Sequence, residues 1–223
     1  MTSTEGAILA ALLHADSAMP SGSFAFSWGL EELYEDRLLT EDDRLDVILR
    51  WYLTTRWASF DRFFVHHSCL ADRDSRTELD RRFTAASSGA AARESGVRAG
   101  RAMLLAWSKV GAPGASEYLQ LVKSGDADGN LPVVQGIVYA ESGMSADHAV
   151  AVSGWSFLSN LASAAVRLGN IGALAAQKSL VNTLPDLERM IAAPIPATPV
   201  SWGVLQDIAM ERHARRTSRL FAS

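Results

Sequence analysis

Apolar residues recur at helical spacing along most of the chain, and the clearest case lies at 155–177. The apolar positions there are three and four residues apart, which predicts a helix buried over most of its girth. No charged residue occurs in 149–166. We therefore expect this helix to form the centre of the fold. Its apolar face consists of Trp155, Leu158, Leu161, Ala162, Ala165 and Leu168.

A second row on the same helix is polar. Its members are spaced by three and four residues, so they lie on one line that ends in a cation. Small residues in such a row let a neighbouring helix pack closely, and spacing alone favours that interpretation. The alternative is that the row lines a narrow polar passage. The row consists of Ser153, Ser156, Asn160, Ser163 and Arg167.

The other patterned stretches also predict helices. Apolar periodicity or a helix-starting signal marks 7–15, a stretch that begins at 29–32, 40–70, 75–82, 85–110, 116–123, 132–141, 145–168, 173–184, 186–190 and 204–221. Phe24, Phe26 and Trp28 alternate with small residues, but no partner strand follows, so we expect an extended loop whose aromatic rings enter the core. The chain therefore predicts one all-α domain over 1–223, with about eight to ten helices around the central one.

Several residues mark where helices begin and end. Thr40 precedes three acids, and Ser75 with Glu78 forms a capping box. Pro132 suits a first turn, and Ser145 suits the cap of the central helix. Glycine and asparagine at 169–172 interrupt the central helix, and three prolines at 194–199 predict an irregular linker.

Composition narrows the functional classes. The net charge of −4 over 223 residues provides no basic field for nucleic acid. Cys69 is the single cysteine, so an intramolecular disulfide framework is excluded. The first residues lack the basic start of a signal peptide, and the central helix is too rich in serine and alanine for a membrane span. We expect a cytoplasmic protein.

Candidate catalytic and metal-binding groups are sparse. His66 and Cys69 share a helical face, but two ligands make a poor metal site, so we expect no bound metal. The sequence has neither a G-x-S-x-G elbow nor an H-E-x-x-H pair. Glu31 and Glu32 are adjacent carboxylates that diverge on a helix. An enzyme with Glu31 as acid or base, acting on a small molecule, stays open as an alternative.

Three stretches resemble the family of UreF, the urease accessory protein F. The first is LLHADSAMPSGSFAFSWGLE at 12–31, the second spans 131–177, and the third is 207–223 with its DIA, His213 and SRLFAS. They cover a little over a third of the chain. Trp28 and Asn130 depart from the family pattern, which usually has Gln and His there.

The resemblance implies a non-enzymatic helical chaperone for nickel insertion into urease. Its implied partners are UreD (also called UreH), the GTPase UreG and the urease apoprotein, and it implies a homodimer. Nickel would be in transit, with no tightly bound cofactor, through a water-filled passage toward UreD. Regulation of the partner GTPase is a further implication, and a role as a scaffold alone is the alternative.

The resemblance also indicates which residues face partners or the passage. Glu31 and Arg167 are the charged positions that it favours, and Ser156, Asn160 and Ser163 belong to the polar row. At the chain end, Leu220 and Phe221 are expected to be uncovered in the free protein and to bind UreD, flanked by arginines. The remaining candidates are Gln177, His213, Arg215, Ser218 and Arg219.

Overall fold

The computed structural model describes residues 4–16, 26–39, 44–112, 114–217 and 220–221. Every regular element in these ranges is a helix, as predicted. Because α3, η1 and α4 follow one another without a break, the described residues form ten separate helical segments. The elements are α1 (Thr4–Ala15), α2 (Leu30–Glu35), α3 (Leu45–Tyr52), the π-helix η1 (Leu53–Asp61), α4 (Arg62–Leu70), α5 (Arg73–Ala86), α6 (Ala90–Val110), α7 (Ala115–Ser124), α8 (Leu131–Glu141), α9 (Ala146–Arg167), α10 (Ala173–Ala192) and α11 (Val204–Ala214).

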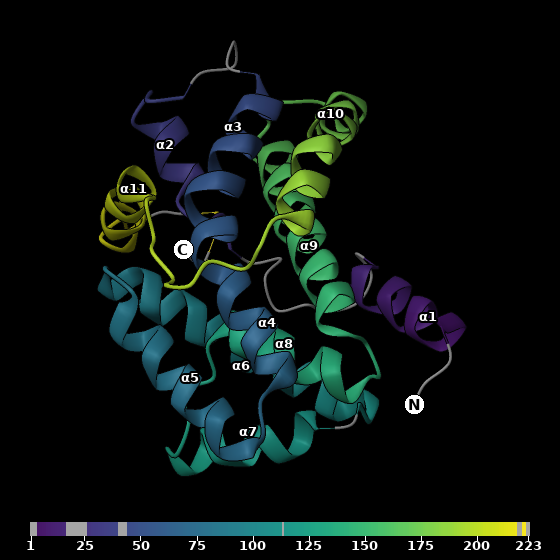
Figure 1. Cartoon of the computed structure of the whole chain (residues 1–223). Helices are drawn as coiled ribbons and strands as arrows, with labels where there is room; N and C mark the ends of the chain where they lie inside the picture. The colour runs from purple at the N-terminus through teal and green to yellow at the C-terminus, as the bar shows by residue number, and fades with distance from the viewer. Residues whose placement is uncertain (1–3, 17–25, 40–43, 113, 218–219, 222–223) are drawn as a thin grey trace.

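The central helix of the prediction is α9, which contacts α1, α4, α8 and α10 (Figure 1). Among the described residues, α9 is the one helix that is long and apolar enough to cross a membrane. However, 61% of its most apolar stretch of 18 residues is buried inside the fold. Such burial is what a core helix requires. The prediction that α9 organises the fold is confirmed.

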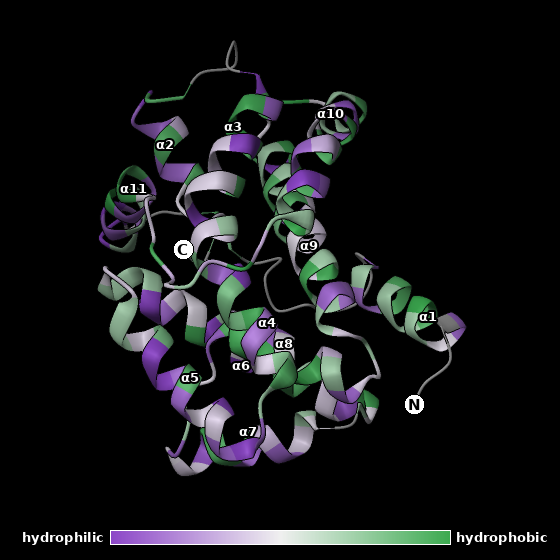
Figure 2. Cartoon of the chain, viewed as in Figure 1, coloured by the Kyte–Doolittle hydropathy of each residue, from purple (hydrophilic) through white to green (hydrophobic). Residues whose placement is uncertain are grey.

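The closest helix packing in the core joins α4 to α8. A Cβ atom at Gly136 would stand 2.5 Å from the carbonyl oxygen of Val65, so only glycine permits this approach. Helices α5, α6 and α7 cover the lower half of the view in Figure 1, while α2, α3 and α10 form the upper half. Figure 2 shows hydrophilic residues along α5 and hydrophobic ones along α1, which lies at the edge of the body.

Most predicted helix signals are confirmed. The Ser145 side chain accepts a hydrogen bond from the backbone of His148, and Pro132 lies in the first turn of α8. The predicted cap of α5 is wrong. Asp72, not Ser75, begins that helix, because its carboxylate accepts the Ser75 backbone N–H at 2.9 Å. The predicted start at Thr40 lies outside the described residues.

Two helix boundaries differ from the prediction. The stretch 85–110 is interrupted at 87–89, where the Ser87 hydroxyl donates to the Phe83 carbonyl and closes α5. Helix α10 continues through Pro185 instead of stopping at Leu184. A proline in a helix removes one bond to the carbonyl four residues earlier. Here that carbonyl belongs to Val181, an exposed residue, so water can satisfy it.

The extended loop before α2 behaves as predicted where it is described. Phe26 and Trp28 are buried in the core, with ring centroids 5.8 Å apart. Phe24 lies outside the described residues. The helix predicted for 204–221 is too long, since α11 ends at Ala214 and the chain then turns back toward α2.

Candidate functional site

The first candidate site is built on α2. Trp28 and Gly29 both have positive φ angles, 54° and 84°, which turn the chain sharply into the helix. A Cβ atom at Gly29 would lie 3.1 Å from the Gln206 carbonyl of α11, so the turn also lets α11 approach closely. Glu31 and Glu32 occupy the first turn of α2, where the helix dipole favours negative charge.

The Glu31 carboxylate binds the end of the chain. It accepts the backbone N–H of Leu220 at 2.7 Å through Oε1 and that of Phe221 at 3.0 Å through Oε2. These charge-assisted bonds join residues that are 189 and 190 positions apart. We call Glu31, Arg167, His213, Leu220 and Phe221 the tail site. Five candidates named from the resemblance therefore meet in one place.

His213 and Arg167 complete the tail site around Phe221. The His213 Nε2 atom lies 3.3 Å from the Phe221 carbonyl oxygen and 3.6 Å from Glu31 Oε2. The Arg167 guanidinium lies 4.2 Å from the centre of the Phe221 ring, a cation–π geometry. Burial lowers the pKa of Arg167 from its ordinary value. The tail thus connects α2, α9 and α11.

Ion pairs add to the attachment of α11. Arg216 Nε lies 2.5 Å from Glu32 Oε2, and this hydrogen bond raises the pKa of Arg216. Arg212 donates to Asp36 at 2.5 Å. Arg215 is exposed. Although they diverge on α2, Glu31 and Glu32 are both buried, and each pairs with the segment that follows α11.

The prediction of an uncovered apolar end is wrong for Phe221 and right for Leu220. Phe221 is 3% exposed because its ring lies under Arg167, whereas the Leu220 side chain is 64% exposed. Ser218 and Arg219 lie outside the described residues. Burial of Phe221 is favourable here because Glu31 accepts its backbone N–H, so no polar group is left without a partner. Arg167 covers the ring itself.

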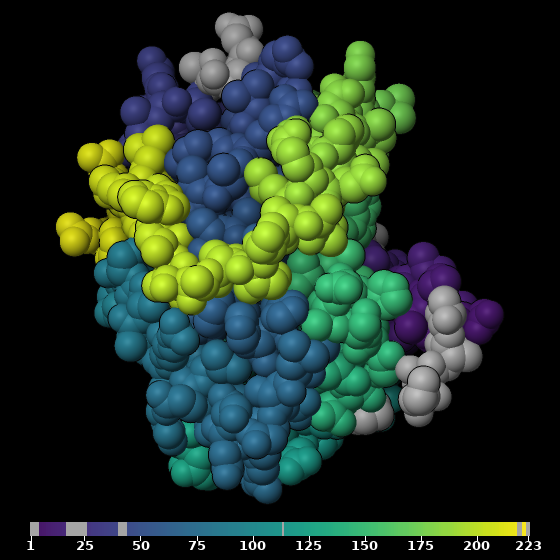
Figure 3. Space-filling model, viewed as in Figure 1, coloured from purple at the N-terminus to yellow at the C-terminus, as the bar shows by residue number. Residues whose placement is uncertain are grey.

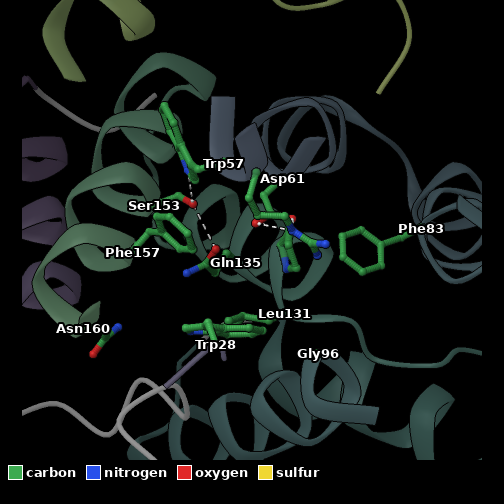
Figure 4. A pocket seen from close by; sticks show the side chains of 12 residues that line it. Trp28, Trp57, Asp61, Phe83, Gly96, Leu131, Gln135, Ser153, Phe157 and Asn160 are labelled. Carbon is green, nitrogen blue, oxygen red and sulfur yellow. Dashed lines mark hydrogen bonds and ion pairs between the residues drawn. The ribbon is translucent and has the colours of Figure 1, made fainter. Parts of the chain in front are cut away.

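The second candidate site is a small, partly enclosed pocket that the polar row of α9 reaches, and we call it the internal cavity (Figure 4). The volume open to the centres of water molecules is about 30 Å³, which is room for about two waters. Ser153 joins two other elements at this cavity, since it accepts from Trp57 Nε1 at 3.2 Å and donates to Gln135 Oε1 at 3.0 Å. Asn160 lines the same cavity, with Trp28 across from it.

The rest of the polar row lies elsewhere. Ser156 is buried and hydrogen-bonds the hydroxyl of Tyr139. Ser163 and Gln177 line a surface groove of about 340 Å³ between α9 and α10, and Ala15 lies at its edge. Arg167 belongs to the tail site. The row that looks continuous on a helical wheel is divided by the fold into an internal part and a surface part.

No group of three or more metal-binding side chains occurs among the described residues. His66 lies on the same helix as Cys69, whose pKa burial raises to about 11. Burial lowers the pKa of His66. The Cys69 thiol lies 3.9 Å from the Met144 carbonyl oxygen. These surroundings favour a protonated thiol, which is a poor ligand for a metal ion.

Sequence reasoning missed the charged lining of the cavity. Arg56 Nε lies 3.0 Å from Asp61 Oδ1, and both side chains are nearly buried in η1. Burial raises the pKa of Asp61, an effect that Arg56 opposes. Residues five apart point in different directions on an α-helix, so their spacing carried no signal of a pair. In a π-helix, by contrast, backbone hydrogen bonds join residues five apart, so this spacing brings two side chains to the same face.

The comparison with known families decides what kind of protein this is. The sequence model of the UreF family matches residues 39–183, from the start of α3 into α10. The chain belongs to the UreF family. The UreF match covers every helix that lines the internal cavity, whereas the tail site lies partly outside it.

Individual relatives extend the UreF comparison to the ends of the chain. A urease accessory protein UreF of Trichodesmium erythraeum is 28% identical over 96% of each chain. One from an Arthrobacter species is 27% identical over 93% of each chain, and one from Corynebacterium glutamicum is 29% identical over 75% of each. The resemblance inferred from three sequence blocks is therefore confirmed over nearly the whole chain.

Proposed function

We propose that this chain is a urease accessory protein that acts in urease maturation as a non-enzymatic chaperone. The observation that carries the proposal is the UreF family match, together with full-length relatives bearing that name. The tail site favours this role over acid–base catalysis by Glu31, since that carboxylate is engaged in holding the backbone of residues 220 and 221. The whole of 1–223 acts as one UreF-like helical domain in this proposal.

The proposed partners are UreD (UreH), the GTPase UreG and the urease apoprotein, in the cytoplasm. The chain works as a homodimer, stimulates or gates the partner GTPase, and holds no tight cofactor while nickel is in transit. Glu31 and Arg167, the charged side chains of the tail site, both contact the tail itself. Because these charges are already engaged within the chain, they favour a protein partner that recognises the surface of the docked tail over a small substrate that binds the charges directly.

The surface proposed for UreD is the exposed side of the docked tail. Leu220 presents its side chain to solvent while its backbone N–H is fixed on Glu31. Arg215 lies five residues earlier in the chain and is also exposed. An apolar side chain on a segment with a fixed backbone, a few residues from a cation, is a suitable interface anchor. The fixed backbone lowers the ordering cost of binding.

The internal cavity is the proposed section of a nickel passage. Asn160, Ser153 and Gln135 provide oxygen atoms at its wall, and such hard ligands can replace water around a metal ion in transit. Room for about two water molecules is too little for a fully hydrated ion. We therefore propose that the cavity widens in the complex. Ser163 lies in the surface groove, so bulk at Asn160, not at Ser163, tests the passage.

The experiment compares two leucine variants of equal exposure. Leu220→Glu places a charge on the docked tail, and Leu70→Glu does so at the end of α4; the two side chains are 64% and 67% exposed. Each chain is expressed with UreD, UreG and urease from the same organism. We expect Leu220→Glu to reduce co-purified UreD at least tenfold and to abolish urease activation, while Leu70→Glu retains both.

Two outcomes would contradict the proposal. If the unaltered chain fails to co-purify with UreD and to support urease activation, the proposed function is wrong. If the unaltered chain succeeds and Leu220→Glu behaves like Leu70→Glu, the function stands and the tail surface is wrong. Circular dichroism of both variants checks that neither has lost its helices.

A further inference from the structure

The internal cavity depends on an uncommon piece of backbone. Residues 53–61 form a π-helix between two α-helices, and the N–H of Arg62 bonds the Trp57 carbonyl five residues earlier. Long π-helices are rare, so local contacts must hold this one. Two threonines contribute, because Thr54 and Thr55 donate their hydroxyls to the carbonyls of Arg50 and Trp51, four residues earlier. Such bonds compete with the α-helical pattern.

The π-helix is what brings Arg56 to Asp61. On an α-helix residues five apart point roughly 140° apart, whereas the π-helix bonds the backbone at that spacing and puts both side chains on one face. Arg56 then lies with Nε 3.0 Å from Asp61 Oδ1 and with its guanidinium 4.7 Å from the Phe60 ring centre. Both charged side chains and Trp57 line the cavity. The shape of the cavity therefore follows the form of η1.

An extended segment binds the outer side of the same π-helix. We call residues 194–203, between α10 and α11, the strap; in Figure 3 it crosses the blue helix on the surface. Its Val200 N–H donates to the Ser59 carbonyl at 3.0 Å, and its Trp202 N–H donates to the Thr55 carbonyl at 2.9 Å. The two donors are two residues apart on an extended chain and so face the same way.

We propose that the strap holds residues 53–61 in the π-helical form and thereby keeps the Arg56–Asp61 pair closed over the cavity. When the strap leaves, the segment returns to the more favourable α-helical pitch, Arg56 separates from Asp61, and the cavity opens. In this change α4 stays in place because the contact at Gly136 fixes it against α8, so α3 is the helix that rotates. The Trp202 side chain is 68% exposed, so the strap can be reached without opening the core. The inference concerns the free chain and does not depend on urease.

The test removes the two donors without removing the strap. Val200→Pro with Trp202→Pro deletes both N–H groups. Val200→Ala with Trp202→Ala is the matched control, since it trims the side chains and keeps the donors. Nitrogen-15 NMR follows hydrogen exchange at Arg56 Nε–H and at the Arg62 amide, which makes the bond specific to the π-helix. We expect exchange at both to accelerate at least tenfold in the proline variant and less than threefold in the alanine variant.

Equal exchange at Arg56 Nε–H in the proline variant and the unaltered chain would overturn the proposal. A measurement on the unaltered chain decides the matter if the proline variant does not fold. There we expect the amides of Val200, Trp202 and Arg62 to exchange with the same opening free energy, because they open together. Exchange at Val200 and Trp202 that is a hundredfold faster than at Arg62 would contradict the coupling.

Discussion

The two ends of the chain are attached to the fold by different physics. The C-terminal end is held by directional contacts, since Glu31 binds two backbone N–H groups and Arg167 covers the Phe221 ring. The N-terminal helix α1 instead packs through small apolar side chains against α9 and through the ring of His14, which also lies 4.8 Å from the Tyr139 ring. His14 stacks on Trp107 with ring centres 3.9 Å apart, and its Nε2 lies 2.9 Å from the Ser142 hydroxyl.

The outer faces of the two ends differ as well. Helix α1 exposes a row of aliphatic side chains, and among the described residues no charged group of this helix forms an ion pair with a neighbouring helix. Helix α11 also exposes aliphatic side chains at Val204, Leu205 and Ile208, but α11 and the segment after it carry charged groups that pair with α2. Charged hydrogen bonds fix one geometry, while non-directional apolar contacts permit several. We therefore expect the tail site to be specific and stable, and α1 to be the end that detaches first. The exposed row on α1 consists of Ile8, Leu9, Leu12 and Leu13.

The largest effect is expected from neutralising the tail site. Glu31→Gln keeps the shape of the side chain, but its amide nitrogen cannot accept the N–H that Glu31 now binds. Hydrogen bonds to a charged group contribute about 1.5–3 kcal/mol each, so we expect a loss of about 3 kcal/mol from the free energy of unfolding. Urea unfolding measures it. Glu188→Gln, at an exposed acid of α10, is the control, and equal stability of the two variants would contradict the tail contacts.

A medium effect is expected at α1 as the pH falls. Burial lowers the pKa of His14 from 6.5 to about 4, so the unfolded or detached state binds a proton more readily than the docked state. Stability is therefore present above pH 6.5 and is lost as the pH falls toward 4. Between pH 7 and pH 5 this amounts to about 2 kcal/mol.

Comparison with a variant isolates the His14 contribution from that of other titrating groups. His14→Phe keeps a ring against Trp107 and has no proton to gain. Urea unfolding and limited proteolysis of α1 are measured at pH 7 and pH 5 for both proteins. We expect the unaltered chain to lose about 2 kcal/mol more than the variant. Parallel losses in the two proteins would show that His14 is not the pH-sensitive anchor.

The smallest effect is expected on the outer face of α1. Leu9→Gln and Leu12→Gln change side chains that are already in water, so the free energy of unfolding should change by less than about 0.5 kcal/mol. The melting temperature measures this. A loss above about 1.5 kcal/mol would mean that the row is covered in the free protein, for example by a second copy. The concentration dependence of the melting temperature would then identify that copy.

The helices could be predicted from sequence because their signals are local. Apolar periodicity located α9 and its neighbours, and caps such as Ser145 lie within a few residues of what they bind. The local signals failed at the start of α5, where Asp72 and Ser75 were both possible caps. They also failed within α10, which continues through Pro185 because the carbonyl left without its N–H partner belongs to an exposed residue.

The candidate site could be predicted only in part. The resemblance named Glu31, Arg167 and Phe221 among its candidates, but nothing local says that the three meet, or that a carboxylate binds an amide 190 residues away. The polar side chains predicted to share one line of α9 do lie on that helix. However, its two parts have different surroundings. Asn160 faces the internal cavity and Ser163 the surface groove.

By itself the sequence determined the helices, the central place of α9 and membership of the UreF family. Each follows from periodicity or from residue order, which a linear chain displays directly. Only the tertiary structure decided which buried charges pair and which carbonyls are bound by the strap. A π-helix at 53–61 and an Arg56–Asp61 pair depend on contacts with segments more than a hundred residues distant, and such contacts leave no periodic trace in the chain.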